Sequence, residues 1–486
     1  MVTAFSLPAN RRRALLETGL VVAAALALTW LPVPVGALLV LGLTAALLTL
    51  IFPWIVWIVL AAVLPVAAGL RYGPASPADG LIAVGLALWW ADGVRRGSLR
   101  LQAVLPATAL LVYLAVLLAA AVGALDLGEA LIEVVKWVEF AGVVVLMPLA
   151  FPNRRAEWLV IALLAAAMTQ AGIGLYQFIF RIGPDWFLIQ GRFMRASGVF
   201  RQPNPYAGYL GLTLPVAISL SFYAVSRFGE EHRRLVAWTR LVFYPVSAVV
   251  IALGLIASWS RGGWLGAIAG AVVVLALYSR RTAGLLAAAA ATVALLALGG
   301  TLNPAGLPPA LTTRIADLPA YFGLGGALDQ PITDENFAVI ERLAHWVAAL
   351  RMWELRPWLG VGPGNYAAAY ASVALPRWDD PLGHAHNIYL NVLAETGLAG
   401  LLAFAAMWLS LGGWVLRQAW RTRDSFTHAL AVGVAGVLTH LTVHSVFDNL
   451  FVQGMVIHLA LWLVAVAVSV YPSPGSTRSS LHESEN

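Results

Sequence analysis

The sequence HAHNIYLNVLAETGLAG occupies residues 384–400 and combines a polar head with the start of an apolar run. Two histidines, His384 and His386, precede a segment that stays apolar to about Leu416. A run of this length is enough for a helix that crosses a bilayer. An imidazole accepts a proton readily near neutral pH, as a catalytic base must. The plainer interpretation is that His386 and Asn387 only cap a membrane helix, and the stretch alone leaves both open.

The composition extends this apolar character to the whole chain. Of the 486 residues, 60% are hydrophobic and 11% are charged. About 20 apolar residues make one helical span, and such runs follow one another along the sequence. We therefore predict an all-α polytopic membrane protein with 12–14 transmembrane helices, at about 14–31, 33–51, 53–70, 78–93, 103–123, 131–151, 157–178, 206–226, 241–259, 264–278, 283–299, 388–416, 427–445 and 452–471.

The arginine clusters orient these spans. With fourteen spans and a cytoplasmic N-terminus, all the clusters fall on one side, as the positive-inside rule requires. Both termini are then expected in the cytoplasm. We divide the chain into N-terminal transmembrane helices at 1–178, a core at 179–471 and a disordered cytoplasmic tail at 472–486. The core includes an outer loop at 300–387, and loops of that length are usually functional or disordered.

Arginines that lie on the outer side, against this bias, indicate an anionic ligand there. Arg195 lies in the outer loop at about 179–207. Arg261 sits in a Ser-Arg-Gly-Gly turn between two spans, where an ionised side chain is a functional candidate. Arg342 and Arg351 flank the apolar stripe of an amphipathic helix predicted over 337–355, which would lie on the membrane or cover the bundle. That stripe consists of Val339, Leu343, Trp346, Leu350 and Trp353.

Other features exclude several classes of protein. The sequence GVGPGN at 360–365 follows no strand and lacks the G-x-G-x-x-G spacing, so it predicts a turn rather than a nucleotide loop. The chain has no cysteine, which excludes disulfides and thiolate metal sites. Lys136 is the only lysine among 30 basic residues. No basic run is interleaved with exposed aromatic residues, so nucleic acid is not an expected partner.

Four motifs follow one another along residues 190–450. They are Arg195-Ala-Ser-Gly with Pro203-Asn204, then Ser260-Arg261-Gly262, then Arg342 followed by Pro357-Trp-Leu-Gly-Val-Gly, and finally His386-Asn387 with Gly397 and Gly400. In this order they resemble the bacterial O-antigen ligase and polymerase superfamily of lipid-linked glycan transferases. The last of them is similar to the ligase signature of His-Asn, nine residues and Gly-x-x-Gly.

The resemblance implies both an architecture and a reaction. The architecture is GT-C-like, with a helical cap on the periplasmic face between the helices near 283–299 and 388–416. The reaction transfers a glycan from undecaprenyl pyrophosphate to a hydroxyl of lipid A-core or another glycan, on the outer face of the cytoplasmic (inner) membrane. Family ligases are regarded as metal-independent and inverting, so neither a metal nor a cofactor is expected.

The resemblance also assigns roles to individual residues. His386 would be the general base, and Arg261 and Arg342 would clamp the pyrophosphate and offset charge on the leaving oxygen. Substrate-binding positions are assigned to Arg195, Asn204, His384, Asn387 and Arg351.

Two clusters of titratable residues leave alternatives open. His384 and His386 beside Asp379 and Asp380 could form a metal site, since imidazole and carboxylate suit zinc or manganese. On the penultimate span, three residues one turn apart either line an acceptor cavity or pack helices together; they are His440, His444 and Asp448.

Glu395 lies nine residues after His386, so we expect it to pair with an arginine rather than contact that histidine. At the level of function, polymerisation of an O-antigen or exopolysaccharide uses the same motifs as ligation and differs in the acceptor. A transporter of lipid-linked sugars would place its ionisable residues near the membrane midplane. Here they gather at helix ends, which favours an enzyme.

Overall fold

The computed structural model describes residues 42–44, 47–49, 51–70, 75–95, 97, 105–151, 155–189, 191–298, 331–333, 336–422 and 425–470. By contacts the chain divides into two units, residues 1–56 and 57–486. The predicted first span, most of the second, the first third of the outer loop at 300–330 and the polar tail at 472–486 fall outside the described residues. Apart from Ile55 and Val56, everything that follows concerns the second unit.

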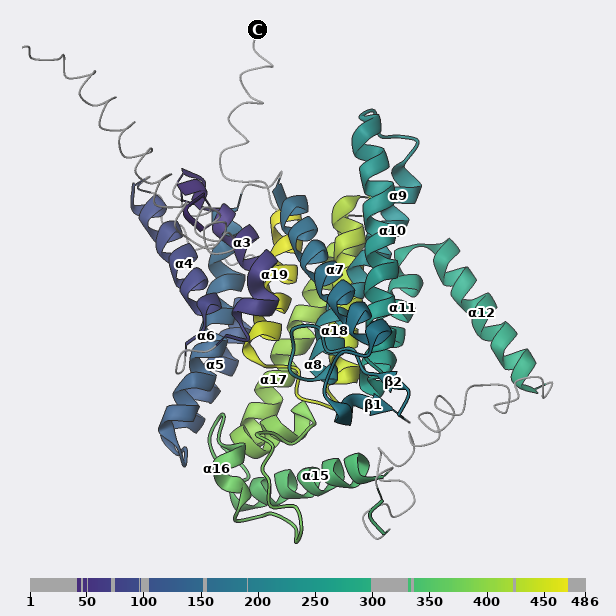
Figure 1. Ribbon diagram of the computed structural model, residues 1–486. Helices are drawn as coiled ribbons and strands as arrows, with labels where there is room; N and C mark the ends of the chain where they lie inside the picture. Colours follow the sequence, from purple (N-terminus) through teal and green to yellow (C-terminus); the bar gives the residue numbers. More distant parts are fainter. Residues whose placement is uncertain are drawn as a thin grey trace, which may run out of the picture. The chain divides into compact units, whose positions relative to one another are not determined.

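Helices dominate the described part of the chain (Figure 1). In chain order they are α3 (Ile55–Ala67), α4 (Pro77–Arg95), α5 (Ala107–Val122), α6 (Leu127–Ala150), α7 (Ala156–Phe180), α8 (Pro203–Gly211), α9 (Leu214–Arg227), α10 (Arg234–Ala257), α11 (Arg261–Tyr278), α12 (Arg280–Leu298), α15 (Phe337–Leu355), α16 (Tyr366–Tyr370), α17 (Ile388–Arg421), α18 (Phe426–His444) and α19 (Gln453–Val470).

Among the described residues, six helical segments are long and apolar enough to cross a membrane. They are α7, α8 with α9, α10, α11, α17 and α18. Three shorter apolar helices lie at Ile55–Ala67, Ala107–Val122 and Gly454–Val470. The chain is therefore an all-α polytopic membrane protein, as predicted, while the count of 12–14 spans stays a prediction.

One predicted span, 206–226, is interrupted. The helix stops at Gly211 and restarts at Leu214, with Pro215 in the first turn of α9. Proline has no N–H group and fits the start of a helix better than its interior. The outer loop before this break contains a two-stranded antiparallel hairpin, β1 (Leu188–Ile189) and β2 (Phe193–Met194).

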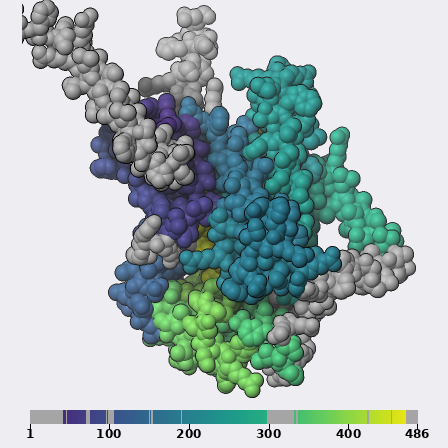
Figure 2. All heavy atoms as spheres, in the orientation of Figure 1, coloured from purple at the N-terminus to yellow at the C-terminus, as the bar shows by residue number. Residues whose placement is uncertain are grey.

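The amphipathic helix predicted over 337–355 forms over the same residues, as α15. Its buried face differs from the predicted stripe, because Leu350 is 39% exposed. Alanines take the buried positions instead, including Ala344, Ala348 and Ala349. Small side chains let α15 approach α16 and the start of α17 closely, and together they form one apolar cluster. We call residues 337–387 the cap; Figure 2 shows its green atoms as one continuous surface.

The helix α17 is broken at Gly397, which has φ +64° and ψ −165°. The segment 357–362 enters this break and makes four backbone hydrogen bonds of 2.8–3.2 Å with α17. A Cβ atom at Gly397 would lie 2.3 Å from the carbonyl carbon of Trp358. Glycine is thus required here for its positive φ and for the close approach of another backbone. The sequence GVGPGN at 360–365 forms the predicted turn, with Asn365 N–H bonded to the Gly362 carbonyl.

Candidate active site

The loop that leads into α17 holds the two histidines in an unusual backbone conformation. His386 has φ +50°, a region that costs free energy for a residue with a side chain. Four hydrogen bonds hold it there. The Asn387 side chain caps α17 by accepting from two backbone N–H groups, Asn391 Oδ1 accepts from Ala385 N–H, and Ile388 N–H bonds to the carbonyl of Ser445. Such strain is typical of functional sites.

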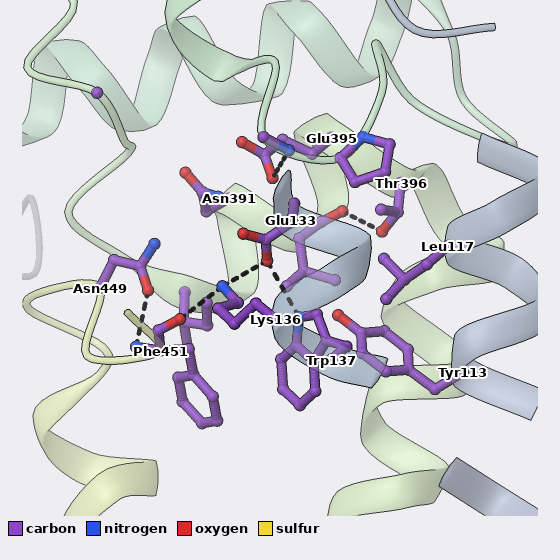
Figure 3. Close-up of a pocket in the computed structure, with 15 residues that line it drawn as sticks. Tyr113, Leu117, Glu133, Lys136, Trp137, Asn391, Glu395, Thr396, Asn449 and Phe451 are labelled. Carbon is purple, nitrogen blue, oxygen red and sulfur yellow. Dashed lines mark hydrogen bonds and ion pairs between the residues drawn. The ribbon is translucent and has the colours of Figure 1, made fainter. Parts of the chain in front are cut away.

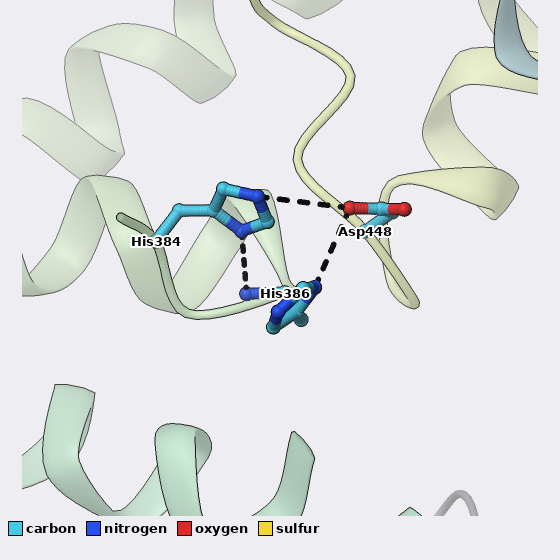
Figure 4. A group of neighbouring side chains, drawn as sticks. All are labelled: His384, His386 and Asp448. Carbon is cyan, nitrogen blue, oxygen red and sulfur yellow. Dashed lines mark hydrogen bonds and ion pairs between the residues drawn. The ribbon is translucent and has the colours of Figure 1, made fainter. Parts of the chain in front are cut away.

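His384, His386 and Asp448 form a compact cluster (Figure 4). The Nδ1 atom of His386 lies 3.6 Å from Asp448 Oδ1, and the Nε2 atom of His384 lies 4.0 Å from the same oxygen. The two imidazole centroids are 4.3 Å apart. Asp448 follows α18 in a short turn and its side chain is 9% exposed. A carboxylate that faces one nitrogen of an imidazole fixes the ring and favours a proton on that nitrogen.

Protonation in the cluster follows from its contacts. His384 Nδ1 accepts a hydrogen bond of 3.0 Å from the His386 backbone N–H, so the neutral ring carries its proton on Nε2, facing Asp448. Burial and the neighbouring His386 lower the pKa of His384 to about 4, which makes it neutral at pH 7. Burial alone would raise the pKa of Asp448, but His386, His384 and Arg342 together hold it below its usual value. At neutral pH the cluster therefore contains one negative charge, on the Asp448 carboxylate.

Neither ring nitrogen of His386 has a hydrogen-bond partner among the described residues, and both atoms are buried. With Nδ1 turned toward Asp448, the lone pair of Nε2 is left for a group that the chain itself does not supply. A buried polar atom without a partner in a native fold calls for an explanation. A substrate hydroxyl is one that matches the chemistry of a general base.

The cap brings Arg342 and His345 to this cluster. α15 packs through Val339 and Leu343 on Phe447, the residue before Asp448. The guanidinium of Arg342 contributes to the pKa shifts of His384 and Asp448 described above. His345 lies 5.8 Å from His386 between ring centroids.

His345 is held by hydrogen bonds with Tyr366. The Tyr366 hydroxyl donates to the His345 carbonyl and lies 3.0 Å from His345 Nδ1, so Nδ1 is the donor in that contact. Burial, with a smaller effect of the neighbouring histidines, lowers the pKa of His345 to about 4. The ring is therefore neutral at pH 7 and contributes a fixed surface beside His386.

Arg261 is the first residue of α11, immediately after the N-cap Ser260. The next residue, Gly262, lies against His444 and Phe447, where a Cβ atom would come within 2.7 Å of the His444 ring and 3.3 Å of Phe447 Cβ. This contact places the N-terminus of α11 beside the turn that carries Asp448. A helix N-terminus attracts anions through its free N–H groups and its dipole, and an arginine there adds a full charge.

Arg195 and Asn204 hold the neighbouring loop against the α10–α11 junction. Arg195 Nη2 donates to Asn204 Oδ1 and its Nε donates to the Ser258 carbonyl, both at 3.0 Å. The Ala196 N–H also bonds to the carbonyl of Ala257. These contacts support the position of Arg261 three residues beyond Ser258.

Two further predicted substrate-binding residues have visible structural roles. Asn387 caps α17, and Arg351 donates to the carbonyl of Val373 in the cap. Arg351 lies nine residues beyond Arg342 on α15, roughly 13 Å along the helix axis. His440 and His444 are buried and pack against glycines of neighbouring helices. His444 Nδ1 lies 3.4 Å from His440 Nε2.

Glu395 does not pair with an arginine, contrary to the expectation. Its carboxylate accepts from the backbone N–H groups of Gly364 and Tyr366, which turn back over α17 at the break. The expectation was wrong because the segment that reaches Glu395 comes from the cap, 29–31 residues away in the chain.

The cluster also has the donor atoms of a metal site. His384, His386 and Asp448 each offer one ligand atom, and these atoms lie within 4.8 Å of one another. Two imidazoles and a carboxylate suit zinc. The carboxylate is Asp448 rather than Asp379 or Asp380, which the sequence had suggested. A metal bound to His386 Nδ1, the nitrogen that faces Asp448, would leave the ring proton on Nε2, so metal binding and general-base catalysis are alternatives.

Sequence reasoning left Asp448 unassigned and did not consider His345. Both lie far in sequence from His386, and neither belongs to a motif. The available signal for Asp448 was an acidic residue shortly after a predicted membrane helix, because a charge near the membrane needs a partner. His345 follows Arg342 by three residues, so it shares one helix face with an assigned residue.

Two comparisons with known proteins bear on the family of the chain. A comparison with curated proteins finds no match. Residues 246–405 match the family model described as O-antigen ligase. This range contains α11, the cap and the start of α17, and so includes Arg261, Arg342 and His386. Over these residues the chain is similar to the O-antigen ligase family, which supports the resemblance to the O-antigen ligase and polymerase superfamily.

Proposed function

We propose that this protein transfers a glycan from undecaprenyl pyrophosphate to an acceptor hydroxyl, in the manner of an O-antigen ligase. The family match supports the reaction type. The observation that carries the assignment is the half-buried His386, whose ring nitrogens are both buried, with Asp448 3.6 Å from one of them and no partner for the other among the described residues. That arrangement suits the removal of a proton from a hydroxyl.

In the proposed reaction His386 Nε2 takes the proton of the acceptor hydroxyl. The oxygen then forms a bond to the anomeric carbon of the donor sugar, and the bond from that carbon to the pyrophosphate oxygen breaks. Direct displacement of this kind inverts the anomeric configuration. Asp448 orients the imidazole and stabilises the imidazolium that forms. The proton passes afterwards to the released undecaprenyl pyrophosphate or to solvent.

The pyrophosphate is assigned to the N-terminus of α11 with Arg261, opposite Arg342 on the cap. Pyrophosphate is already a good leaving group, so charge stabilisation is the main requirement. Arginine binds phosphate oxygens in a bidentate manner and keeps its charge in any environment. Arg195 and Asn204 support this side of the site, and no metal ion is required by the proposal.

The reaction is assigned to the outer face of the cytoplasmic membrane, with both termini in the cytoplasm. Lipid A-core or another glycan is the proposed acceptor. Polymerisation uses the same base and the same pyrophosphate contacts, with the growing glycan as acceptor. Ligase and polymerase are therefore separated by the acceptor and not by the residues described here.

The test is transfer by the purified full-length protein in nanodiscs, with an undecaprenyl-pyrophosphate glycan as donor and candidate acceptor glycans. His386→Ala is expected to lower the rate by about 10²–10⁴. His232→Ala is the control, because His232 is an exposed histidine that contacts the Glu230 carbonyl in the α9–α10 loop. Equal rates for His386→Ala and the unchanged protein would remove the proposed base.

Chelation separates the metal-free mechanism from a zinc site. Treatment with EDTA followed by gel filtration is expected to leave the transfer rate unchanged. A rate that falls with chelation and returns with zinc would assign His384, His386 and Asp448 to a metal instead.

A further inference from the structure

The only lysine of the chain, Lys136, lies on α6 and reaches the turn that carries Asp448 (Figure 3). Its ammonium is 2.7 Å from the carbonyl oxygen of Phe451 and 2.6 Å from Glu133 Oε1 on the same helix. Lys136 is only 8% exposed, and a charge is costly to remove from water unless it is paired and hydrogen-bonded. Both requirements are met here, so the ammonium is a fixed donor that joins α6 to the segment after α18.

The segment 445–452 connects α18 to α19 without helix or strand, so side-chain contacts help to decide its shape. Asp448 Oδ1 accepts a hydrogen bond of 2.8 Å from the N–H of Asn449. Asn449 Oδ1 accepts one of 3.0 Å from the N–H of Phe451. The Phe451 carbonyl accepts from Lys136. These three hydrogen bonds form a chain from the ammonium on α6 to the carboxylate of the catalytic cluster.

The ring of Phe451 is held separately from its backbone. Trp137, the residue after Lys136, stacks on this ring with centroids 6.1 Å apart. Phe404 and Trp408 of α17 meet the ring at centroid distances of 5.4 Å and 5.3 Å. These aromatic contacts seat Phe451 in the bundle, and the hydrogen bond from Lys136 sets the direction of its carbonyl. Loss of the ammonium is therefore expected to shift the turn without unseating the ring.

A shift of the turn would act on the oxygen that faces the proposed base. Asp448 Oδ1 accepts from the Asn449 N–H, and the same atom lies 3.6 Å from His386 Nδ1. The groups that hold the pKa of Asp448 low are residues of the site itself. The influence of Lys136 on Asp448 therefore runs through the turn and not through its charge.

We propose that Lys136 is a positioning residue for the transfer reaction: by holding the Phe451 carbonyl, it keeps the Asp448 carboxylate facing the general base. The inference rests on the proposed function. Glu133 is the counter-ion that keeps the ammonium in place. Because α6 precedes residues 246–405, the range that matches the family model, the N-terminal helices gain a part in the reaction.

The test is single-turnover transfer by full-length Lys136→Met in nanodiscs, at saturating donor and acceptor. Methionine keeps the length of the side chain and removes the charge and the donors. The rate is expected to fall by about 10–10², with KM for the donor within about threefold, because a small misplacement of a catalytic group slows the chemical step. In an Asp448→Asn background the same change is expected to cost less than about twofold, since a residue that acts through this carboxylate cannot act without it.

Val138→Met is the matched control, because it puts the same side chain on α6 at a position that is 50% exposed. If Lys136→Met yields no folded protein, Asn449→Ala takes its place. It breaks the middle of the hydrogen-bond chain and leaves the pair of Lys136 with Glu133 intact, so the same loss and the same lack of additivity are expected. Losses that multiply in the double variant, or a rate within about twofold of the unchanged protein, would overturn the inference.

Hydrogen exchange measures the position of the turn without reference to the reaction. Peptides that cover residues 446–453 are expected to exchange at least about tenfold faster in Lys136→Met, while peptides from the α9–α10 loop stay unchanged. Unchanged exchange in the turn would overturn the inference even if transfer is observed. Full activity of His386→Ala, together with faster exchange in Lys136→Met, would overturn the proposed function and leave Lys136 as a residue that only shapes the turn.

Discussion

Replacing Asp448 with asparagine removes the charge of the catalytic cluster and keeps its size. Asp448 Oδ1 lies 3.6 Å from His386 Nδ1. At an effective dielectric constant of about 20, a charge at roughly this distance stabilises an imidazolium by about 4 kcal/mol. Because 1.4 kcal/mol corresponds to a tenfold change in rate, full proton transfer in the transition state predicts a loss of roughly 10³ in kcat. If the proton is only partly transferred in the transition state, the predicted loss in kcat is about 10².

The assay is single-turnover transfer at saturating donor and acceptor, which isolates the chemical step from binding. Donor affinity, measured separately, is expected to stay the same or improve, since Arg342 loses a nearby negative charge that competes with pyrophosphate. Asp92→Asn is the control, because it removes a carboxylate from a surface pair with Arg95. A kcat for Asp448→Asn within threefold of the unchanged protein, with the fold intact, would refute the orienting role of Asp448.

Three further predictions concern other parts of the structure. Gly397→Ala is expected to lower the free energy of unfolding by more than about 2 kcal/mol, because the added Cβ would lie 2.3 Å from the backbone of Trp358. Gly412→Ala on the same helix is the control, since a Cβ atom there meets nothing within 4 Å. Equal unfolding temperatures for the two variants would contradict this prediction. In the folded protein the pKa of His345 is lowered to about 4, so its ring stays neutral down to that pH. In the unfolded chain the same ring takes a proton below about pH 6.5. Stability should therefore fall by about 2–3 kcal/mol as pH drops through that window, and a pH series of unfolding temperatures for His345→Gln should show a flatter slope. Arg261→Lys keeps the charge but loses bidentate geometry, so KM for the donor should rise about tenfold; an unchanged KM would exclude a pyrophosphate contact.

The helices were predictable because apolar length and helical spacing are local properties. The bounds of α15 follow from such a pattern, and the structure has them at Phe337–Leu355. Its buried face follows the predicted stripe at Val339 and Leu343 but not at Leu350, which is exposed while alanines are buried. Close approach of neighbouring helices favours small residues, and that preference depends on partners distant in sequence.

The candidate site was predictable only where motifs carry it. His386, Arg261 and Arg342 belong to motifs. Arg342 lies near enough to the cluster to lower the pKa of Asp448, and Gly262, which follows Arg261, contacts Phe447 beside Asp448. Asp448 lies on the turn after α18, and only folding brings it to His386. Gly397 was recognised as part of a motif. A glycine is needed at this position because the segment 357–362, about 40 residues earlier in the chain, enters the break in the helix.

The four backbone hydrogen bonds at Gly397 join the cap to a membrane helix as one mechanical piece. Breaking these four hydrogen bonds would cost about 4 kcal/mol, before any loss of apolar contact is counted. The cap is therefore expected to stay docked during turnover instead of lifting as a lid. Under the proposed function, a long lipid carrier then enters sideways from the bilayer, and exchange of the carrier depends on spacing between helices.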